Sequence, residues 1–469
     1  MTAIEATGTQ QTSRPSITDD EASRYLIPPG PKPTLRGLKA TCSTGHPAVN
    51  EAIIKVLSDG GNAVDAAIAG CMVQAVVEQH LTNHTGTISL LYHEASTGTY
   101  HQLDSSGTFA SGLAPFHANR PMGVDGRYVA CIPGFMPGLK AMFERFVSRP
   151  WTLLCEDAIY WAEEGHFVTS QEYASHSSSI DWTTYYPEGR QHYMSDGFLT
   201  PVGYRHRQQL LADTLRRVAA EGPDYMIAGP WAEKFVRKGH KLDWNVTTDH
   251  MLETPPRWQG PMRLSYEEYE IVSLAAPQQQ GVYLQMVLGI MRHLGIDLSE
   301  HVRLTRSPHG KTGYPTGLGK EKWPSPSTCE VSVIDQHGNG VQMTHTFQTN
   351  GIPGMVIDGV PMRGSSAQST GFGPGSDAKI LAGCRMRRAL GSTFVLKDGK
   401  PIYQLGNPGW VLFTIPQVLH NLLDFKMEPF EAVDAPRLFP LQEHGSVTVE
   451  DRSYRQDCHR RVERTRPWC

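Results

Sequence analysis

The spacing of apolar positions predicts two consecutive helices near the start of the ordered chain. Over residues 48–57 the apolar side chains recur on one stripe, and Gly60-Gly61 supplies a typical helix end. Asn62 is a preferred N-cap residue, so a second helix is expected from there to about Glu78. Because this second helix is composed almost entirely of small and apolar residues, we expect it to pack inside the protein.

Further along the chain, the same pattern predicts both strands and helices. Residues 88–92 and 98–104 are expected to form a strand pair, and residues 266–274 another strand. Residues 206–240 have the period of amphipathic helices, and residues 281–294 form a helix with one apolar face. The sequence therefore predicts a protein that mixes helices with sheets.

A hairpin is predicted in the second half of the chain. Apolar and polar residues alternate over 329–334, a turn follows at 335–339, and a second strand covers 340–347. The two prolines of PSPS at 324–327 remove backbone donors and favour an extended, exposed segment. Thr328 therefore lies where an exposed loop enters the first strand of the hairpin.

A threonine in this position can carry out a specific reaction. Its hydroxyl can attack the carbonyl of Ser327, convert the peptide bond to an ester, and leave a new chain end after hydrolysis. The resulting terminal Thr328 has its own α-amine as the general base, which is one known form of activated nucleophile. The alternative is a threonine that only opens a strand, which is a common placement for this residue.

Composition and charge narrow the classes of function. The chain has 469 residues and a formal net charge of −4, without a run of Lys or Arg, so no nucleic-acid partner is expected. Its eight cysteines are scattered without metal-ligand spacing, which indicates reduced thiols and no metal site. We find neither a signal-peptide pattern nor an apolar run of membrane length, so the sequence predicts a cytoplasmic protein without a membrane partner.

A series of motifs in fixed order resembles the γ-glutamyltransferase family of Ntn hydrolases. The series begins with GHP at 45–47, VLSDGGNAVDAA at 56–67 and VE at 77–78. It continues with AIYWAEEG at 158–165 and LADTLRRVAAEG at 211–222, in the region that resembles the large subunit of that family. An ordered series of this length is far more specific than any single motif.

The resemblance implies a fold, a chain division and a set of catalytic residues. The fold is the α+β class, a four-layer αββα sandwich, and no cofactor or metal is implied. TCEVSVID at 328–335 is similar to the start of the family's small subunit, so Thr328 falls on its nucleophile and the cleavage site on Ser327 and Thr328. Thr346 falls on the residue that assists the terminal amine. Gly409 and Trp410 fall on a turn whose backbone N–H groups stabilise an oxyanion.

The substrate-binding residues of the family are not retained. Ser106 stands where the family has an Arg that binds the substrate α-carboxylate, and Arg363 stands near its ammonium-binding Asp. Without opposite charges at both ends, a γ-glutamyl compound is not the expected substrate. We expect Ser106, Gln348, Arg387 and Arg388 to contact the substrate, and the alternative for the two arginines is an exposed surface position.

The sequence thus predicts an autoprocessed hydrolase or acyltransferase acting on a small molecule. Residues 1–37 are expected to be a disordered lead-in, residues 38–327 the large-subunit region, and residues 328–469 the small-subunit region, with both fragments staying associated. Two alternatives remain open. One is hydrolysis of a carbon–carbon or amide bond in antibiotic or specialised-metabolite biosynthesis. The other, suggested by the short segment before Thr328, is an unprocessed pseudoenzyme or binding scaffold.

Overall fold

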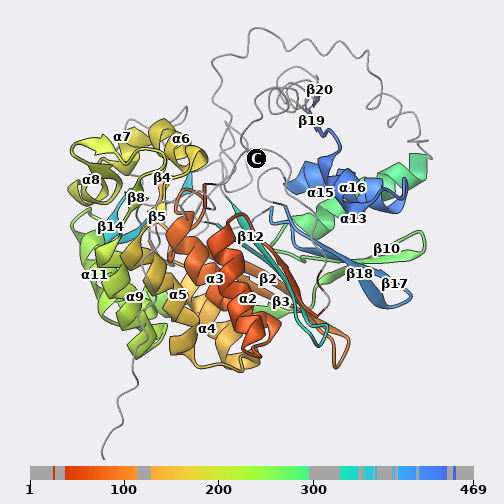
Figure 1. Ribbon diagram of the computed structural model, residues 1–469, viewed down its shortest axis with the longest axis horizontal. Helices are drawn as coiled ribbons and strands as arrows, with labels where there is room; N and C mark the ends of the chain where they lie inside the picture. Colours follow the sequence, from red (N-terminus) through yellow and green to blue (C-terminus); the bar gives the residue numbers. More distant parts are fainter. Residues whose placement is uncertain are drawn as a thin grey trace, which may run out of the picture.

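Helices and sheets occupy separate layers of the protein. The computed structural model describes residues 25–26, 37, 39–113, 128–294, 328–346, 352, 354–362, 365–366, 383, 385, 389–407, 411–440 and 447–449. Figure 1 shows helices from the first half of the chain beside the central strands, with a second group of strands and helices next to them. This mixture of helices and sheets agrees with the predicted α+β class.

The central sheet has six strands in the order β1-β12-β13-β2-β3-β9, and every neighbouring pair is antiparallel. Its strands are β1 (Thr41–Ser43), β12 (Cys329–Ile334), β13 (Gly340–Thr346), β2 (Thr87–Glu94), β3 (Thr99–Ser105) and β9 (Arg257–Gln259). The predicted strand pair is β2 and β3, and the predicted hairpin is β12 and β13. Because this hairpin lies between β1 and β2, distant parts of the chain are interleaved in one sheet.

The turn of the β12–β13 hairpin is fixed by the side chain of Asp335. Its Oδ1 accepts hydrogen bonds from the N–H groups of His337 and Asn339, at 2.9 and 3.0 Å. Gly338 has a φ of +82°, a left-handed conformation that costs glycine little. Asp335 Oδ2 also accepts the N–H of Ala63 at 3.0 Å, so the turn is attached to the first residue of a buried helix.

A second sheet has four strands in the order β10-β11-β17-β18. These are β10 (Met262–Tyr266), β11 (Tyr269–Ser273), β17 (Thr393–Lys397) and β18 (Lys400–Leu405). The strand predicted at 266–274 is β11, but its first residue, Tyr266, belongs to β10. Glu267 adopts a φ of +50° and turns the chain between the two strands, and no glycine in the sequence indicates this turn.

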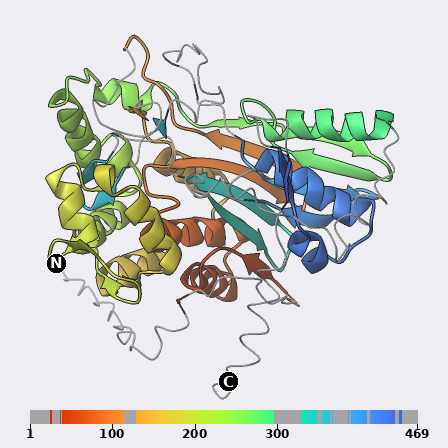
Figure 2. The same cartoon turned by 90° about the horizontal axis from the view of Figure 1, so that it is seen from above.

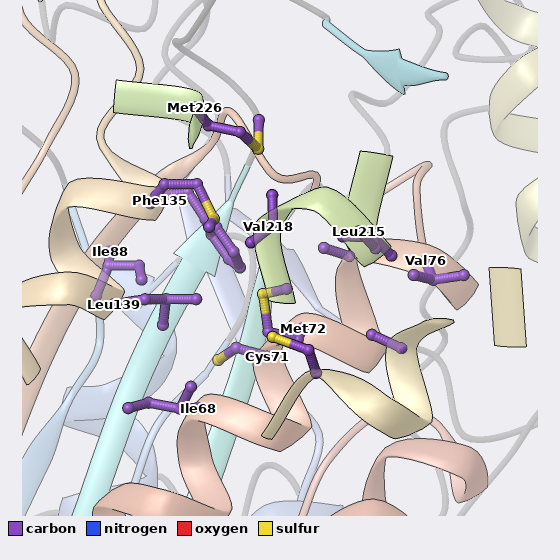
Figure 3. Close-up of a cluster of buried hydrophobic side chains, with 14 of the residues drawn as sticks. Ile68, Cys71, Met72, Val76, Ile88, Phe135, Leu139, Leu215, Val218 and Met226 are labelled. Atoms are coloured by element: carbon purple, nitrogen blue, oxygen red, sulfur yellow. The ribbon is translucent and has the colours of Figure 1, made fainter. Parts of the chain in front are cut away.

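Helices α2 (Pro47–Ser58), α3 (Ala63–Val77) and α4 (Phe135–Phe146) cover one face of the central sheet. All fifteen residues of α3 are buried, as its composition predicts. The predicted cap is confirmed, because the Asn62 side chain accepts from the N–H of Asp65 while the Asp65 carboxylate accepts from the N–H of Asn62. Figure 3 shows Met72 of α3 within the apolar cluster that also contains Phe135 and Leu139 of α4.

A helical region continues outward from α3. It consists of α5 (Trp151–Glu164), α6 (Ser170–Ser178), α7 (Ile180–Thr183), α8 (Pro187–Tyr193), α9 (Gln209–Glu221), α10 (Asp224–Ile227), α11 (Pro230–His240) and α12 (Thr248–Leu252). Short ladders join β5 (His166–Phe167) to β8 (Arg205–His206), β6 (Met194–Ser195) to β7 (Phe198–Leu199), β14 (Val356–Ile357) to β15 (Val360–Pro361), and β16 (Ser365–Ser366) to β4 (Tyr128–Val129). The β14–β15 turn comes from late in the chain, and it packs among α8, α9 and α11 (Figure 1).

The outer face of the second sheet is covered by α13 (Gln280–Leu294) and α15 (Val411–Leu423), with α16 (Pro429–Asp434) against α15. A short ladder of β19 (Leu438–Pro440) and β20 (Val447–Val449) follows. A separate apolar cluster joins the two sheets, with Leu91 of the central sheet and Phe394 of the second. From bottom to top, Figure 2 shows the red helices, then strands, then the green helix α13.

Three further features bear on the sequence-based expectations. Tyr25, inside the lead-in expected to be disordered, packs its ring against Trp161 and donates a hydrogen bond of 2.9 Å to Glu51. The five cysteines that can be described are free thiols. Within the described segments, no helix combines the length and the apolar character needed to cross a membrane.

Candidate active site

Four hydroxyl side chains form one row across the central sheet. The ladders pair Cys329 with His345, Thr346 with Thr87, and Ile88 with Ser105. Continuing the first and third ladders by one residue sets Thr328 opposite Thr346 and Ser106 opposite Thr87. Residues directly opposite in antiparallel strands project on the same face, with Cβ atoms about 4.5–5.5 Å apart. We call Thr328, Thr346, Thr87 and Ser106 the hydroxyl row.

In the hydroxyl row, the predicted catalytic residues Thr328 and Thr346 are adjacent, whereas the predicted substrate-binding residue Ser106 is distant from Thr328. Thr328 and Thr346 are neighbours, and both are nearly or fully buried, with exposed fractions of 9% and 1%. Ser106 is in the same row but three strand spacings from Thr328, which corresponds to about 14 Å. The row lies on the face of the central sheet that packs against the second sheet, since Thr344, two residues before Thr346, has its hydroxyl 3.3 Å from that of Ser392.

The loop before β2 supports the end of β13 at Thr346. Asn83 Oδ1 accepts from the N–H and the hydroxyl of Thr85, at 3.0 and 2.8 Å. Gly86 then passes so close to the carbonyl of Thr346 that a Cβ there would overlap it. His345 is held on the opposite face, with Nδ1 2.9 Å from the hydroxyl of Thr82 and Nε2 2.7 Å from Gln74 Oε1. The backbone of Thr346 is thereby fixed from both sides.

Cys329, the residue after Thr328, is held in the core by a buried carboxyl group. Its Sγ lies 3.9 Å from Glu78 Oε2, and Gln74 donates to the same oxygen at 2.6 Å. Burial raises the pKa of the Cys329 thiol well above its ordinary value, and raises that of Glu78 to about 7. A buried thiol with a raised pKa is a poor nucleophile, which argues against Cys329 as the nucleophile.

Glu330 is a functional candidate that the sequence reasoning missed. It lies two residues from Thr328 on the same face, where Oε1 accepts from the Thr344 hydroxyl at 2.6 Å and Oε2 from Gln342 Nε2 at 2.9 Å. The residue retains some exposed area, but its carboxyl group also contacts Gly406 and is enclosed. Burial raises its pKa to about 8 against the opposing effect of the two hydrogen bonds. One feature of the sequence could have indicated Glu330. The small subunit of the γ-glutamyltransferase family commonly begins with Thr-Thr-His, and Glu330 stands at the position of that His.

Ser106 belongs to a second polar cluster at the end of β3. Its hydroxyl donates to Asp104 Oδ1 at 2.5 Å, and Gln278 Nε2 lies 3.0 Å from both the Ser106 hydroxyl and Asp104 Oδ1. Asp104 is fully buried, and its Oδ2 lies 3.8 Å from Arg385 Nε. Arg385, which sequence reasoning did not select, is thus engaged with the protein's own carboxylate, and Arg257 of β9 lies opposite Asp104 in the ladder.

The remaining predicted site residues lie outside the described residues. These are Ser327 of the cleavage site, Gly409 and Trp410 of the oxyanion turn, and Gln348, Arg387 and Arg388 of the substrate site. Helix α15 begins at Val411, the residue after Trp410. In the part of the chain that the structure describes, no three His, Cys, Asp or Glu side chains are grouped as a metal site requires.

Comparison with known proteins agrees with this arrangement. The gamma-glutamyltranspeptidase family matches residues 49–309 and 303–465. A glutathione hydrolase proenzyme of Pseudomonas aeruginosa is 26% identical over 471 aligned residues, covering 85% of this chain and 82% of that protein. An acylase ACY 1 proenzyme of a Pseudomonas species is 25% identical, with coverage of 90% and 85%.

A similar fold is found among solved structures. A cephalosporin acylase from Bacillus halodurans superposes with a TM-score of 0.68 at 22% identity, over 92% of this chain and 90% of that one. At this identity the likeness shows the fold alone, whereas the family match extends over most of the sequence. The resemblance of the ordered motifs is confirmed, and the chain belongs to the γ-glutamyltranspeptidase family.

Proposed function

We propose that this γ-glutamyltransferase-like enzyme is made as one chain that cuts itself between Ser327 and Thr328. The Thr328 hydroxyl attacks the carbonyl carbon of Ser327, the C–N bond breaks, and the hydroxyl proton passes to the departing nitrogen. Water then hydrolyses the resulting ester, leaving a Ser327 carboxylate and a Thr328 with free hydroxyl and α-amine. The entry of Thr328 into β12 supports this proposal, since its Oγ follows the scissile bond directly.

In the matured enzyme, Thr328 is proposed as the nucleophile and its α-amine as the general base. The observation that carries this proposal is the register that sets Thr328 opposite Thr346. At a Cβ separation of about 5 Å, the Thr346 hydroxyl can hydrogen-bond the terminal amine or the attacking hydroxyl. An acyl-enzyme forms as the leaving group departs, and water or an amine then releases the acyl group. Gly409 and Trp410 are proposed to supply the oxyanion donors.

The two fragments, 38–327 and 328–469, are proposed to remain associated after cleavage. The order β1-β12-β13-β2 supports this, because the small fragment would contribute two strands between strands of the large one. Separating the fragments would break both ladders and expose the core beneath them. Helices pack on the outer face of each sheet and an apolar cluster joins the two sheets, which supports the αββα sandwich of Ntn hydrolases as the proposed fold.

The substrate is proposed to be a small acyl compound other than a standard γ-glutamyl compound. The Ser106 hydroxyl already donates a hydrogen bond to Asp104, and Arg385 lies beside the same carboxylate. Neither residue supplies an unpaired positive charge for a substrate α-carboxylate. The likeness to acylases as well as to glutathione hydrolases supports an acyl amide substrate, with Gln348, Arg387 and Arg388 as proposed contacts.

Cleavage can be tested directly on purified protein. We expect two fragments on a denaturing gel, with mass spectrometry locating the new amino terminus at Thr328. Thr328→Ala should give one full-length band. Thr328→Ser keeps a hydroxyl, so it should still cleave, but more slowly than the wild-type protein. A single full-length band from wild-type protein that turns over substrate would refute the mechanism. A single band without any turnover would favour the binding-scaffold alternative.

Substrate choice requires a separate measurement. We compare kcat/KM for a γ-glutamyl anilide with values for acyl anilides carrying a carboxylate near the carbonyl, with Arg388→Ala as the control variant. The γ-glutamyl compound should be at least about 100-fold poorer, because a missing partner for a buried charge costs several kcal/mol. Efficient glutathione turnover that is insensitive to Arg388→Ala would overturn the substrate proposal while leaving the cleavage proposal intact.

A further inference from the structure

A cavity of about 500 Å³ lies in the helical region, and no residue of the hydroxyl row lines it. Its lining residues come from α8, the start of α9, α11 and the β14–β15 turn. The turn is held in place by Trp231 Nε1, which donates to the carbonyl of Ile357 at 3.2 Å, and by Thr214, whose hydroxyl donates to the carbonyl of Asp358 at 2.7 Å. Its volume is within the range of small-molecule sites.

The charge of this cavity is strongly positive. Five cationic side chains line it, against two carboxylates; the cations are Arg207, Lys234, Arg237, Lys238 and Lys241. Two of them are neutralised within the wall, since Lys234 pairs with Asp358 and Lys238 with Glu188. Of the other three, Arg237 pairs with Glu233 on its own helix at 3.5 Å, and Lys241 adds to the effect of Lys238 in lowering the pKa of Glu188, so the cations still outnumber the carboxylates around the cavity. A ligand with a single charge would leave part of this positive field uncompensated, so the charge favours a ligand with several negative charges.

The start of helix α9 adds partial positive charge to one end of the cavity. It begins with Gln209, Leu210 and Leu211, no side chain caps it, and the backbone of Gly359 packs against the Leu211 N–H, so the helix contributes through its field rather than through open donors. The side chain at the cap position, Gln208, is used elsewhere, because its Nε2 donates to the carbonyl of Val76 at 3.1 Å. The first N–H groups of a helix without a side-chain cap carry partial positive charge. This reinforces the field set by the five cations rather than forming a site by itself.

One apolar side chain of the cavity is open to a ligand. Leu210 is 53% exposed, whereas Leu211, Val356 and Ile357, which also line the space, are buried. We propose that this cavity binds a phosphate-bearing small molecule of mononucleotide size, with its phosphates beside the cations of α11 and its apolar part against Leu210. Such a ligand would bridge residues before and after the proposed cleavage point, at a site separate from the acyl-transfer chemistry.

The test is isothermal titration calorimetry on the full chain with ATP, AMP and inorganic pyrophosphate as probes. We expect ATP to bind more tightly than AMP, and pyrophosphate more weakly than ATP because it has no apolar part. The double variant Arg237→Ala/Lys241→Ala should weaken ATP binding at least about tenfold, since it removes two of the five cations that line the cavity. Glu188→Gln should tighten it several-fold, because Lys238 is released from its partner.

Two controls separate this site from general charge attraction and from the active site. Lys397→Ala/Lys400→Ala removes two exposed cations of the second sheet and should leave ATP affinity unchanged. Thr328→Ala should also bind ATP as the parent does, whether or not the chain is cleaved. The proposal is overturned if no probe binds at millimolar concentration, if Arg237→Ala/Lys241→Ala binds as the parent does, or if the remote pair weakens binding equally.

Discussion

Replacing Glu330 by Gln should make the protein less sensitive to alkaline pH. Its carboxyl group is enclosed by Thr344, Gln342 and Gly406, and its pKa is raised from the ordinary 4.5 to about 8. A carboxyl group with a raised pKa binds protons more strongly in the folded than in the unfolded protein. Its stabilising contribution is therefore complete below pH 4.5 and is lost as the pH rises through about 8.

The magnitude follows from the same shift. Between pH 6 and the folded-state pKa, each pH unit costs about 1.4 kcal/mol of unfolding free energy, which gives roughly 3 kcal/mol in all. Because Glu330 keeps some exposed area, water relieves part of this cost, and we expect about 2 kcal/mol. Gln should be tolerated, since the Thr344 hydroxyl can turn toward Ser392 and accept a hydrogen bond from the new amide.

The assay is urea unfolding at pH 6 and pH 9 in a Thr328→Ala background, so that cleavage does not differ between variants. Glu330→Gln should lose about 2 kcal/mol less stability than its parent over this interval. Glu144→Gln, a change at an exposed carboxylate, should behave as the parent does. If Glu330→Gln and the parent lose the same free energy between the two pH values, Glu330 does not titrate with a raised pKa and the reasoning fails.

Three further outcomes are expected. Thr346→Ala should lower kcat at least about tenfold while destabilising by only about 0.5–1.5 kcal/mol, and an unchanged rate in correctly cleaved protein would contradict its role. Gly86→Ala should lower the Tm by several degrees because its Cβ overlaps the Thr346 carbonyl, whereas Gly289→Ala, in open space on α13, should not. Acidification from pH 6.5 to 4.5 should destabilise the Glu330→Gln variant in urea titrations, because burial lowers the pKa of His46, His206 and His345 to about 3 and that of His84 to about 4. These four histidines outweigh Glu78, whose pKa is raised to about 7 and which acts in the opposite direction; constant stability of this variant down to pH 4.5 would refute this.

Local chemistry accounts for the elements that the sequence predicted well. Asn62 and Asp65 form the N-cap of α3 with side chains only three residues apart, so the helix start is encoded in a short segment. The β12–β13 hairpin is likewise encoded by alternating residues and by Asp335, which holds its own turn. Such features need no knowledge of the rest of the fold.

Contacts between distant segments could not be predicted in this way. The hydroxyl row depends on the order of four strands, and no local pattern aligns Thr87 and Ser106 with Thr328. Arg385 contacts Asp104 although 281 residues separate them in the chain, and no local pattern distinguishes Arg385 from Arg387 and Arg388, which were selected instead. Glu330 was missed because its burial comes from Gly406, which approaches from a separate part of the chain.

The interleaved central sheet has a consequence for synthesis of the chain on the ribosome. The N–H of Ala63 finds its acceptor in Asp335, 272 residues later. At about 5–20 residues per second, roughly 14 to 54 s pass before that partner is made. During this interval the β13-facing edge of β2 has no partner, and an unpaired strand edge invites association with other chains. Nascent chains that stop before Gly340 are therefore expected to aggregate, and slower growth at low temperature with abundant chaperone should favour full-length, folded protein.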